Sequence, residues 1–478
     1  MTLTSFLEDR LIMLTKEELK KKYKTANDLI ARVEQVKGNT FGFFDVNHRL
    51  DNMKNKGALG QIVEEGVFGY PINSDPSADF DYLGLELKTT GVIQNKNKTI
   101  SAKERLPLDN INYLEVANHN FMESNMWLKS KGLFLVLYKY IYGSEYKDMP
   151  IVKGIIHRFP PEDLAIIMQD YNKISEKIRN GKAELLSEAD TMYLGACTSG
   201  KDSNDLVAQP FSNVLAKKRK FCLKQSYVTQ IIREKVNYSE LEHIFSFNEI
   251  KNNIFEALIE RELIPFFGKT ESQLQQELNI DSTSKSKFER YIARMLSIKG
   301  KVNNTDEFIK ANIELKTIRV EENGTIKESM SFPYFKFVNV ANTPWDYSEL
   351  KEMLENKKFL FAIFKKINGE FVFKGIKFWN MPVEKIENEC RDVYIKTAEI
   401  INNGNIIKSV SSDSKGSVIR KTNFPGMNFN GVLHVRPHGQ NSNDVDLLPT
   451  EEKTLKIKSY TKQCFWINSG YIRKVIGE

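Results

Sequence analysis

The sequence has 478 residues, of which 69 are Lys or Arg and 62 are Asp or Glu, giving a formal net charge of +7. This length predicts two or three domains, and the mild positive charge permits nucleic-acid binding without requiring it. The four cysteines are far apart and form no Cys-X-X-Cys pair, which argues against a zinc site or a disulfide framework and favours a reduced, cytosolic compartment. A charged N-terminus and the lack of any apolar run of about 18 residues predict neither a signal peptide nor a membrane span.

The first predicted elements are helices. Residues 15–36 have a helix-forming composition, and Thr15 with Glu18 predicts a capping box at the start. Residues 57–69 predict a further helix that carries Glu64 and has Leu59, Ile62 and Val63 on its apolar side.

The next predicted element is a strand at 83–92 that carries two charged residues on one face. Apolar and charged residues alternate along it, so Glu86 and Lys88 point the same way while the neighbouring leucines point into a core. Asp79 lies seven residues before Glu86, directly after a turn-prone Ser-Asp-Pro-Ser run. The two carboxylates are therefore expected to converge at one end of the strand.

An Asp and a Glu that converge in this way form a hard-oxygen site. Such a site suits Mg²⁺, which binds few carboxylates and keeps its other positions for water and substrate phosphate. A lysine beside it can orient a water or stabilise charge that develops on a phosphate, so the set has the parts needed for phosphodiester hydrolysis. For the motif alone the alternative is a solvated strand face, because Glu-X-Lys is a common pattern.

The residues around this motif resemble a known family. The segments Lys56-Gly-Ala-Leu-Gly-Gln-Ile-Val-Glu64, Asp79-Phe and Leu83-Gly-Leu-Glu-Leu-Lys-Thr89 look like those of the MutH family. That family contains a mismatch-repair endonuclease that nicks at GATC and two-domain type II restriction endonucleases that cut at GATC. Its shared pattern is a Glu on a helix, then an Asp, then Glu-Leu-Lys on a strand. The matching residues are Glu64, Asp79, Glu86 and Lys88.

The resemblance implies a role for each residue. Asp79 and Glu86 would hold Mg²⁺, and Glu64 would complete the carboxylate set or contact a water on the metal. Lys88 would polarise the phosphate or orient the attacking water, and Lys56 would approach a phosphate. The implied reaction is in-line attack of a metal-activated water on a phosphodiester of double-stranded DNA, which leaves 5′-phosphate and 3′-hydroxyl ends.

The rest of the first half predicts further strands and a helix. Strands are expected at 111–117, 132–138 and 152–157, and the almost wholly apolar run at 132–138 suits a central strand buried on both faces. A proline pair opens a helix that runs from residue 160 to about residue 179.

A DNA-contact region is implied after this helix. A strand at 193–197 runs into the loop 198–203, which reads bases in the MutH family, and a basic segment follows at 217–224. A solvated surface is the alternative for such a lysine-rich run. The DNA contacts that the resemblance implies here are Lys201, Arg219, Lys220 and Lys224.

The second half repeats the first. From about residue 250, four segments recur in the same order, among them Ile313-Glu-Leu-Lys-Thr-Ile318, which repeats Leu85-Glu-Leu-Lys-Thr-Thr90. With the resemblance, this duplication predicts an α/β protein of two tandem MutH-like restriction-endonuclease-fold domains, each a mixed central sheet flanked by helices. The expected domains are a catalytic one at 1–240 and a pseudo-catalytic, allosteric DNA-binding one at 245–478.

The repeat has not kept the catalytic set. Counting back seven residues from Glu314 gives Glu307, with Asp306 beside it, where the first domain has its aspartate. The helix carboxylate is replaced by Arg294 or Met295. Such changes should weaken Mg²⁺ binding, so the second domain is expected to bind DNA without cutting it.

One segment of the second domain is assigned to base reading. Leu433-His-Val-Arg-Pro-His438 resembles the base-reading strand and loop of the family. An Arg at a loop tip can donate two hydrogen bonds to guanine O6 and N7, so Arg436 is the expected base reader, with His438 beside it on the DNA. His434 and His438 also permit a metal site, but no third ligand is near them in the sequence.

The sequence thus predicts a Mg²⁺-dependent type II restriction endonuclease that cuts double-stranded DNA at GATC in the cytoplasm. Because double-strand cutting needs two active sites, a dimer on DNA or looping between two sites is expected, and a cognate DNA methyltransferase would protect the host. The alternatives are a mismatch-repair-type nicking endonuclease, which has one domain, and a DNA-binding regulator that does not cut. The sequence has no Gly-rich phosphate-binding loop, so an enzyme that acts on nucleotides is not favoured.

Overall fold

The computed structural model describes residues 13–52, 54–73, 75–95, 98–200, 205–236, 241–280, 286–414, 416 and 418–478. These residues form two compact units. The first unit ends at Phe255 but also includes Asn304–Asn312, and the second comprises Glu256–Asn303 and Ile313–Glu478. This division differs from the predicted boundary at 240–245, because residues 245–255 and 304–312 pack with the first unit.

The helices of the first unit begin where capping residues allow. Thr15 and Glu18 form the predicted capping box, but a second box formed by Thr25 and Asp28 splits the helix predicted at 15–36 in two. The helices are α2 (Lys16–Lys22), α3 (Ala26–Val36), α4 (Phe41–Phe44), α5 (Ala58–Ile62), α6 (Tyr113–Asn118), α7 (Asn125–Ser130), α8 (Pro161–Arg179), α9 (Gln225–Val236), α10 (Phe247–Ile250) and α14 (Asp306–Ala311).

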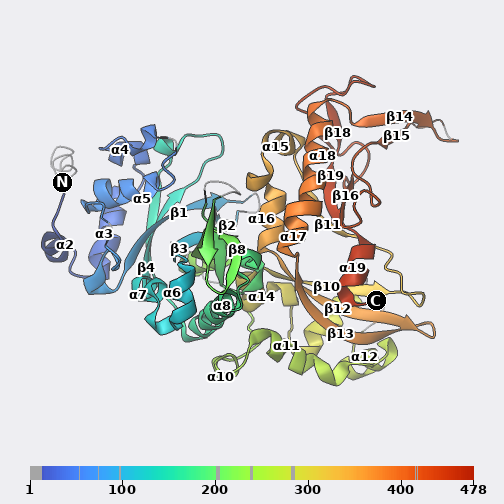
Figure 1. The fold of residues 1–478 in the computed structure, drawn as a ribbon, viewed down its shortest axis with the longest axis horizontal. Helices are drawn as coiled ribbons and strands as arrows, with labels where there is room; N and C mark the ends of the chain where they lie inside the picture. Colours follow the sequence, from blue (N-terminus) through green and yellow to red (C-terminus); the bar gives the residue numbers. More distant parts are fainter. Residues whose placement is uncertain are drawn as a thin grey trace. The chain divides into compact units, whose positions relative to one another are not determined.

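The central sheet of the first unit has the strand order β2-β1-β4-β5 (Figure 1). Its strands are β1 (Glu86–Gln94), β2 (Ile100–Ala102), β4 (Gly132–Lys139) and β5 (Ile151–Arg158). β1 and β4 are parallel and the other pairs are antiparallel, so the sheet is mixed. β4 is buried along almost its whole length, which confirms the central strand predicted at 132–138. Helix α3 packs against β5, where Gly154 admits the Val33 side chain.

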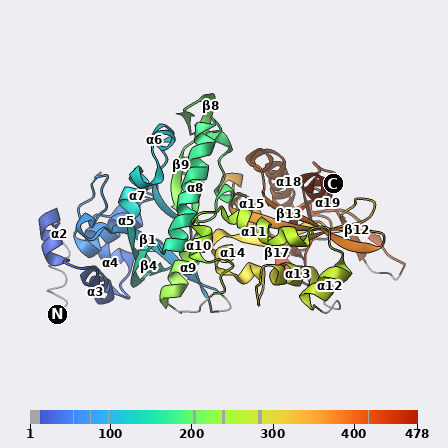
Figure 2. The same cartoon turned by 90° about the horizontal axis from the view of Figure 1, so that it is seen from below.

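A second, antiparallel sheet has the order β3-β9-β6, with strands β3 (Leu106–Asn110), β9 (Arg219–Leu223) and β6 (Leu194–Thr198). A hairpin of β7 (Leu206–Gln209) and β8 (Ser212–Lys217) lies between β6 and β9 in the chain. Figure 2 shows the long helix α8 beside α6 and this sheet. The strand predicted at 111–117 is wrong, because the Asn112 side chain accepts hydrogen bonds from Leu114 N and Glu115 N and starts helix α6 there.

The second unit repeats both sheets. Its mixed sheet has the order β10-β12-β13, with a parallel and then an antiparallel pair, and its other sheet has the antiparallel order β11-β19-β16. The same order and orientation in both units support the predicted duplication of an α/β fold. The strands are β10 (Ile313–Val320), β11 (Met330–Tyr334), β12 (Lys358–Ile367), β13 (Glu370–Asn380), β14 (Ile407–Ser412), β15 (Val418–Thr422), β16 (Leu433–Pro437), β17 (Val445–Leu447), β18 (Ser459–Thr461) and β19 (Gln463–Ile467).

The helices of the second unit flank these sheets. They are α11 (Phe255–Leu263), α12 (Glu271–Leu278), α13 (Lys287–Met295), α15 (Phe337–Asn342), α16 (Glu349–Asn356), α17 (Val383–Lys385), α18 (Arg391–Asn402) and α19 (Ser469–Ile476). In the described part of the chain, no helix is both long enough and apolar enough to cross a bilayer.

A buried ion cluster holds α14 in the first unit. Lys310 Nζ lies 3.0 Å from both carboxylate oxygens of Asp163 and 2.8 Å from Asp306 Oδ2. Tyr227 donates its hydroxyl hydrogen to Asp163 Oδ2 at 2.8 Å. Burial lowers the pKa of Lys310, but the two carboxylates outweigh it and leave that pKa above its ordinary value. This cluster explains why residues 304–312 belong to the first unit.

We expect Lys310→Ala to destabilise the first unit by about 3–5 kcal/mol, because two buried carboxylates lose their cation. Urea unfolding followed by tryptophan fluorescence measures the change. Lys396→Ala is the matched control, because Lys396 is exposed and its pair with Glu399 lies at the surface. A Lys310→Ala protein as stable as the control would contradict the assigned role of the cluster.

Candidate active site

A tight loop brings Asp79 to the first residue of β1. Phe80 and Leu85 exchange two backbone hydrogen bonds of 2.9 and 3.2 Å, and a 3-10 turn at Asp81–Leu83 closes the loop between them. Gly84 completes the turn at a φ of +62°, in the left-handed region that favours glycine. The strand predicted at 83–92 therefore starts later, at Glu86.

Backbone hydrogen bonds then fix the two carboxylates against each other. Leu87 N donates to Asp79 Oδ2 at 2.9 Å, and Asp79 N donates to Glu86 Oε2 at 3.3 Å. Asp79 is partly buried and Glu86 is 2% exposed. The structure thus brings together the carboxylates that the seven-residue spacing predicted.

Glu64 lies on the helix predicted at 57–69, where α5 widens into a π-helical turn at Val63–Phe68. Single π-helical turns occur often at functional sites. The next residue anchors the turn: Glu65 is buried and accepts two hydrogen bonds from Arg49, at 2.8 and 3.1 Å. The half-buried Glu64 side chain lies on the helix position next to this anchored residue.

Two lysines face Glu86. Lys88 Nζ lies 2.9 Å from Glu86 Oε1, as the shared strand face predicted, and Lys129 Nζ lies 3.5 Å from the same oxygen. Lys129 was not among the residues predicted from the sequence. Its position just before the apolar run of β4 could have indicated it, because the parallel pairing of Glu86 with Leu133 places the start of β4 beside the start of β1.

The carboxylates of the site carry more negative charge than the two lysines relieve. Burial, and then the charge of Asp79, raises the pKa of Glu64 to about 7. Burial, and then the charge of Glu86, raises the pKa of Asp79 to about 6. A divalent cation would neutralise this excess, and hard carboxylate oxygens are ligands that such a cation prefers. Asp79 and Glu86, which the two backbone hydrogen bonds hold together, offer such oxygens, and Glu64 stays the predicted third ligand.

A second possible ligand group lies elsewhere in the first unit. Glu188, Cys197 and Cys222 are buried, and their ligand atoms lie within 4.8 Å of one another. Arg105 Nη1 lies 2.5 Å from Glu188 Oε1, so that carboxylate already has a cationic partner.

The predicted DNA contacts of the first unit divide into two groups. Lys56 is exposed and Lys220 is partly exposed, so both remain available as predicted contacts, while Lys201 lies outside the described residues.

Arg219 and Lys224 correct the prediction, because both are buried. Their exposed fractions are 6% and 2%. Arg219 Nη1 donates to the Ala196 carbonyl and Lys224 Nζ to the Thr191 carbonyl, each at 2.6 Å. These cations hold β9 and the residues after it within the fold instead of facing DNA.

The second unit has the same loop bond with a different side chain. Leu315, which follows Glu314, donates its backbone N–H to Asn303 Oδ1 at 2.7 Å, as Leu87 does to Asp79. Asn303 therefore stands in the place of Asp79, and the predicted counterpart Glu307 is wrong. Glu307 instead accepts hydrogen bonds from the backbone at Ile244, at 3.0 and 3.2 Å, within the first unit.

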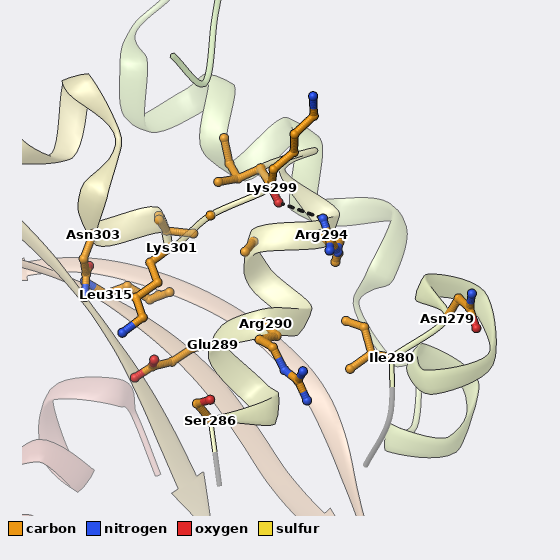
Figure 3. A pocket seen from close by; sticks show the side chains of 14 residues that line it. Asn279, Ile280, Ser286, Glu289, Arg290, Arg294, Lys299, Lys301, Asn303 and Leu315 are labelled. Atoms are coloured by element: carbon orange, nitrogen blue, oxygen red, sulfur yellow. Dashed lines mark hydrogen bonds between the residues drawn. The ribbon is translucent and has the colours of Figure 1, made fainter. Parts of the chain in front are cut away.

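Glu314 and Arg294 of the second unit can be compared with Glu86 and Glu64 of the first. Glu314 lies 2.6 Å from Lys316 Nζ and 2.9 Å from Lys357 Nζ. Arg294 lines a cavity with Asn303 (Figure 3), whereas Met295 is buried, so Arg294 is the residue that replaces the helix carboxylate. Glu314 is thus the one carboxylate that this unit retains from the set of three.

Arg436 lies near the end of β16, at the surface. Its guanidinium carbon lies 4.6 Å from the centroid of the Trp466 ring, and the ring of His438 lies 5.6 Å from the same ring. Both residues are exposed, whereas His434 is buried and hydrogen-bonded to Asn468. The stacking holds Arg436 at the strand end in a position open to a ligand.

Comparison with known proteins agrees with this geometry. The chain is 33% identical to the type II restriction enzyme Sau3AI of Staphylococcus aureus over 454 residues, which is 88% of this chain and 93% of that enzyme. The chain belongs to the MutH-like type II restriction endonucleases. The family model described as DNA mismatch repair enzyme MutH matches residues 68–170, a range that contains Asp79, Glu86, Lys88 and Lys129.

More distant relatives match less than half of the chain. The DNA mismatch repair protein MutH of Shewanella woodyi is 28% identical over 44% of this chain and 91% of its own length. MutH of Shewanella baltica strain OS155 is 28% identical over 38% of this chain and 82% of its own length. The protein is thus a restriction endonuclease, a hydrolase that acts on DNA, and its chain is longer than the part that these relatives match.

We expect the affinity of the site for a divalent cation such as Mg²⁺ to rise on the order of tenfold from pH 6 to pH 8. Protonation of Glu64 and Asp79 below pKa values of about 7 and 6 competes with the cation, so binding near pH 6 should also release protons. Calorimetric titration in two buffers of different ionisation enthalpy measures both quantities. Asp79→Asn is the control and should bind the cation weakly at either pH. An affinity that is the same at pH 6 and pH 8 would contradict the assignment.

Proposed function

We propose that the first unit hydrolyses double-stranded DNA at GATC with Mg²⁺, and that Glu64, Asp79, Glu86 and Lys88 form its active site. The observation that carries the proposal is the pair of hydrogen bonds at Leu87 and Asp79, which holds two carboxylates together where burial raises the pKa of Asp79. GATC is the target that the resemblance to the MutH family implies.

The chain's own residues account for binding and orientation at the site. Mg²⁺, when bound, would supply the positive charge that activates a water and offsets charge on the phosphate. Lys88 Nζ, held at Glu86, can donate a hydrogen bond to a phosphate oxygen or to the attacking water. Lys129 adds a second cation on the same side of Glu86, and Lys56 lies on the exposed approach to α5.

The second unit, in this proposal, binds DNA without cutting it. Asn303 offers a neutral amide where the first unit has a carboxylate, and Arg294 offers a cation where the first unit has Glu64, so the metal ligands are lost. Arg436 and His438 would contact bases from the end of β16. With one cutting unit per chain, a dimer on DNA or looping between two sites would supply the second cut.

Two consequences concern the host. An enzyme that cuts unmodified GATC requires protection of the host genome, so we propose a cognate DNA methyltransferase as its partner in a restriction–modification system. We also propose that the enzyme acts in the cytoplasm, where its DNA substrate lies.

The test is a Mg²⁺-dependent digest of an unmethylated plasmid with several GATC sites. Wild type should give discrete fragments that end at GATC, and Asp79→Ala and Glu86→Ala should each lower the rate by at least about 100-fold, because each removes a metal ligand. Asp81→Ala is the matched control, since Asp81 is an exposed carboxylate two residues from Asp79.

Other products would redirect or overturn the proposal. Nicked circles alone would indicate a repair-type nicking enzyme, and an intact plasmid that is retarded in a binding gel would indicate a DNA binder. Cleavage by Glu86→Ala at the wild-type rate would show that Glu314 supports a second active site, against the assignment of the two units.

A further inference from the structure

The second unit has a cavity of about 370 Å³ at the place of its lost active site (Figure 3). Leu315 and Asn303, which share the hydrogen bond that matches the Leu87–Asp79 bond, both line it. Its remaining walls come from helix α13 and from residues 298–302. The cavity is thus what the duplicated site has become after losing its metal ligands.

The lining of this cavity is positively charged. Of the described residues, Arg290, Arg294, Lys299 and Lys301 line it, together with one carboxylate, that of Glu289. The two arginines are four residues apart on α13, so they share one face of the helix. Arg294 Nη1 donates to the Ile298 carbonyl at 3.3 Å, a bond that steadies the guanidinium while using one of its five N–H groups.

The glutamate retained beside the cavity does not restore a negative site. Burial raises the pKa of Glu314, but Lys357 and Lys316 outweigh it and hold that pKa below its ordinary value. Among the described residues that line the cavity, cations outnumber carboxylates, which suits an anion.

We propose that this cavity binds an internal phosphodiester group of duplex DNA, with arginine and lysine side chains in the role that a metal ion has in the first unit. The proposal rests on the proposed DNA binding by the second unit. A guanidinium group can donate two hydrogen bonds to phosphate oxygens, and Arg290 and Arg294 each bring such a group to the cavity wall. The volume exceeds that of a lone anion.

The test uses the full-length chain with Asp79→Ala, which keeps the DNA intact. Its affinity for a fluorescent duplex is measured by anisotropy without divalent cations over a range of NaCl concentrations. Adding Arg290→Ala and Arg294→Ala should weaken binding to duplexes of any sequence and should reduce the slope of log affinity against log salt by about one, the loss of one phosphate contact. Arg290→Lys with Arg294→Lys should keep most of the slope, because the charge remains.

A matched double variant controls for the change in net charge. Lys327→Ala with Lys396→Ala removes two exposed cations whose partners, Glu321 and Glu399, lie at the surface. An unchanged slope in the arginine variant, or an equal fall in this control, would overturn the proposal. The proposal would also be overturned if the arginine variant weakened binding only to duplexes that carry a 5′-terminal phosphate. The ligand would then be a cut end of DNA.

One further arm separates this proposal from the proposed function. Arg436→Ala should weaken binding to GATC duplexes more than to other duplexes. If Arg436→Ala has that effect and the arginine pair has none, the second unit binds DNA and the cavity assignment fails. If neither variant changes binding, DNA binding by the second unit fails as well.

Discussion

One backbone hydrogen bond organises the site in each unit. In the first unit the N–H of Leu87, just after Glu86, holds the carboxylate of Asp79, and this bond fixes both acidic groups at the end of a central strand. In the second unit Leu315 makes the same bond to Asn303. The hydrogen bond survives the exchange because an amide oxygen accepts it as a carboxylate does. The negative charge of the carboxylate is absent at Asn303, and metal binding depends on that charge.

The two units thus share a scaffold and differ in electrostatics. Both keep a glutamate flanked by two lysines, Glu86 in the first unit and Glu314 in the second. Around Glu86 the additional groups are carboxylates, whereas arginines and lysines surround the cavity beside Glu314. A fold-level comparison alone would not separate the two units, and the residues at the two sites are what distinguish them.

Local sequence patterns predicted much of the fold and of the first site, since alternation along a strand and a seven-residue spacing act over short distances. Features that depend on long-range pairing were not predicted from the sequence. Lys129 reaches Glu86 through the parallel register of two strands, and Asn303 replaces the predicted Glu307 because the loop before the second strand changed length after duplication. At 111–117 a single capping side chain, Asn112, overrode the strand pattern. Arg219 was misassigned because charge in a sequence does not reveal burial.

The central claim is that one unit of the two binds the catalytic metal. The most direct measurement is anomalous diffraction from crystals of the full-length protein soaked in Mn²⁺, which replaces Mg²⁺ at hard-oxygen sites. The account predicts a peak among Glu64, Asp79 and Glu86, and none between Asn303 and Glu314. A peak beside Glu314, or none beside Glu86 in crystals soaked at neutral or higher pH, would contradict it.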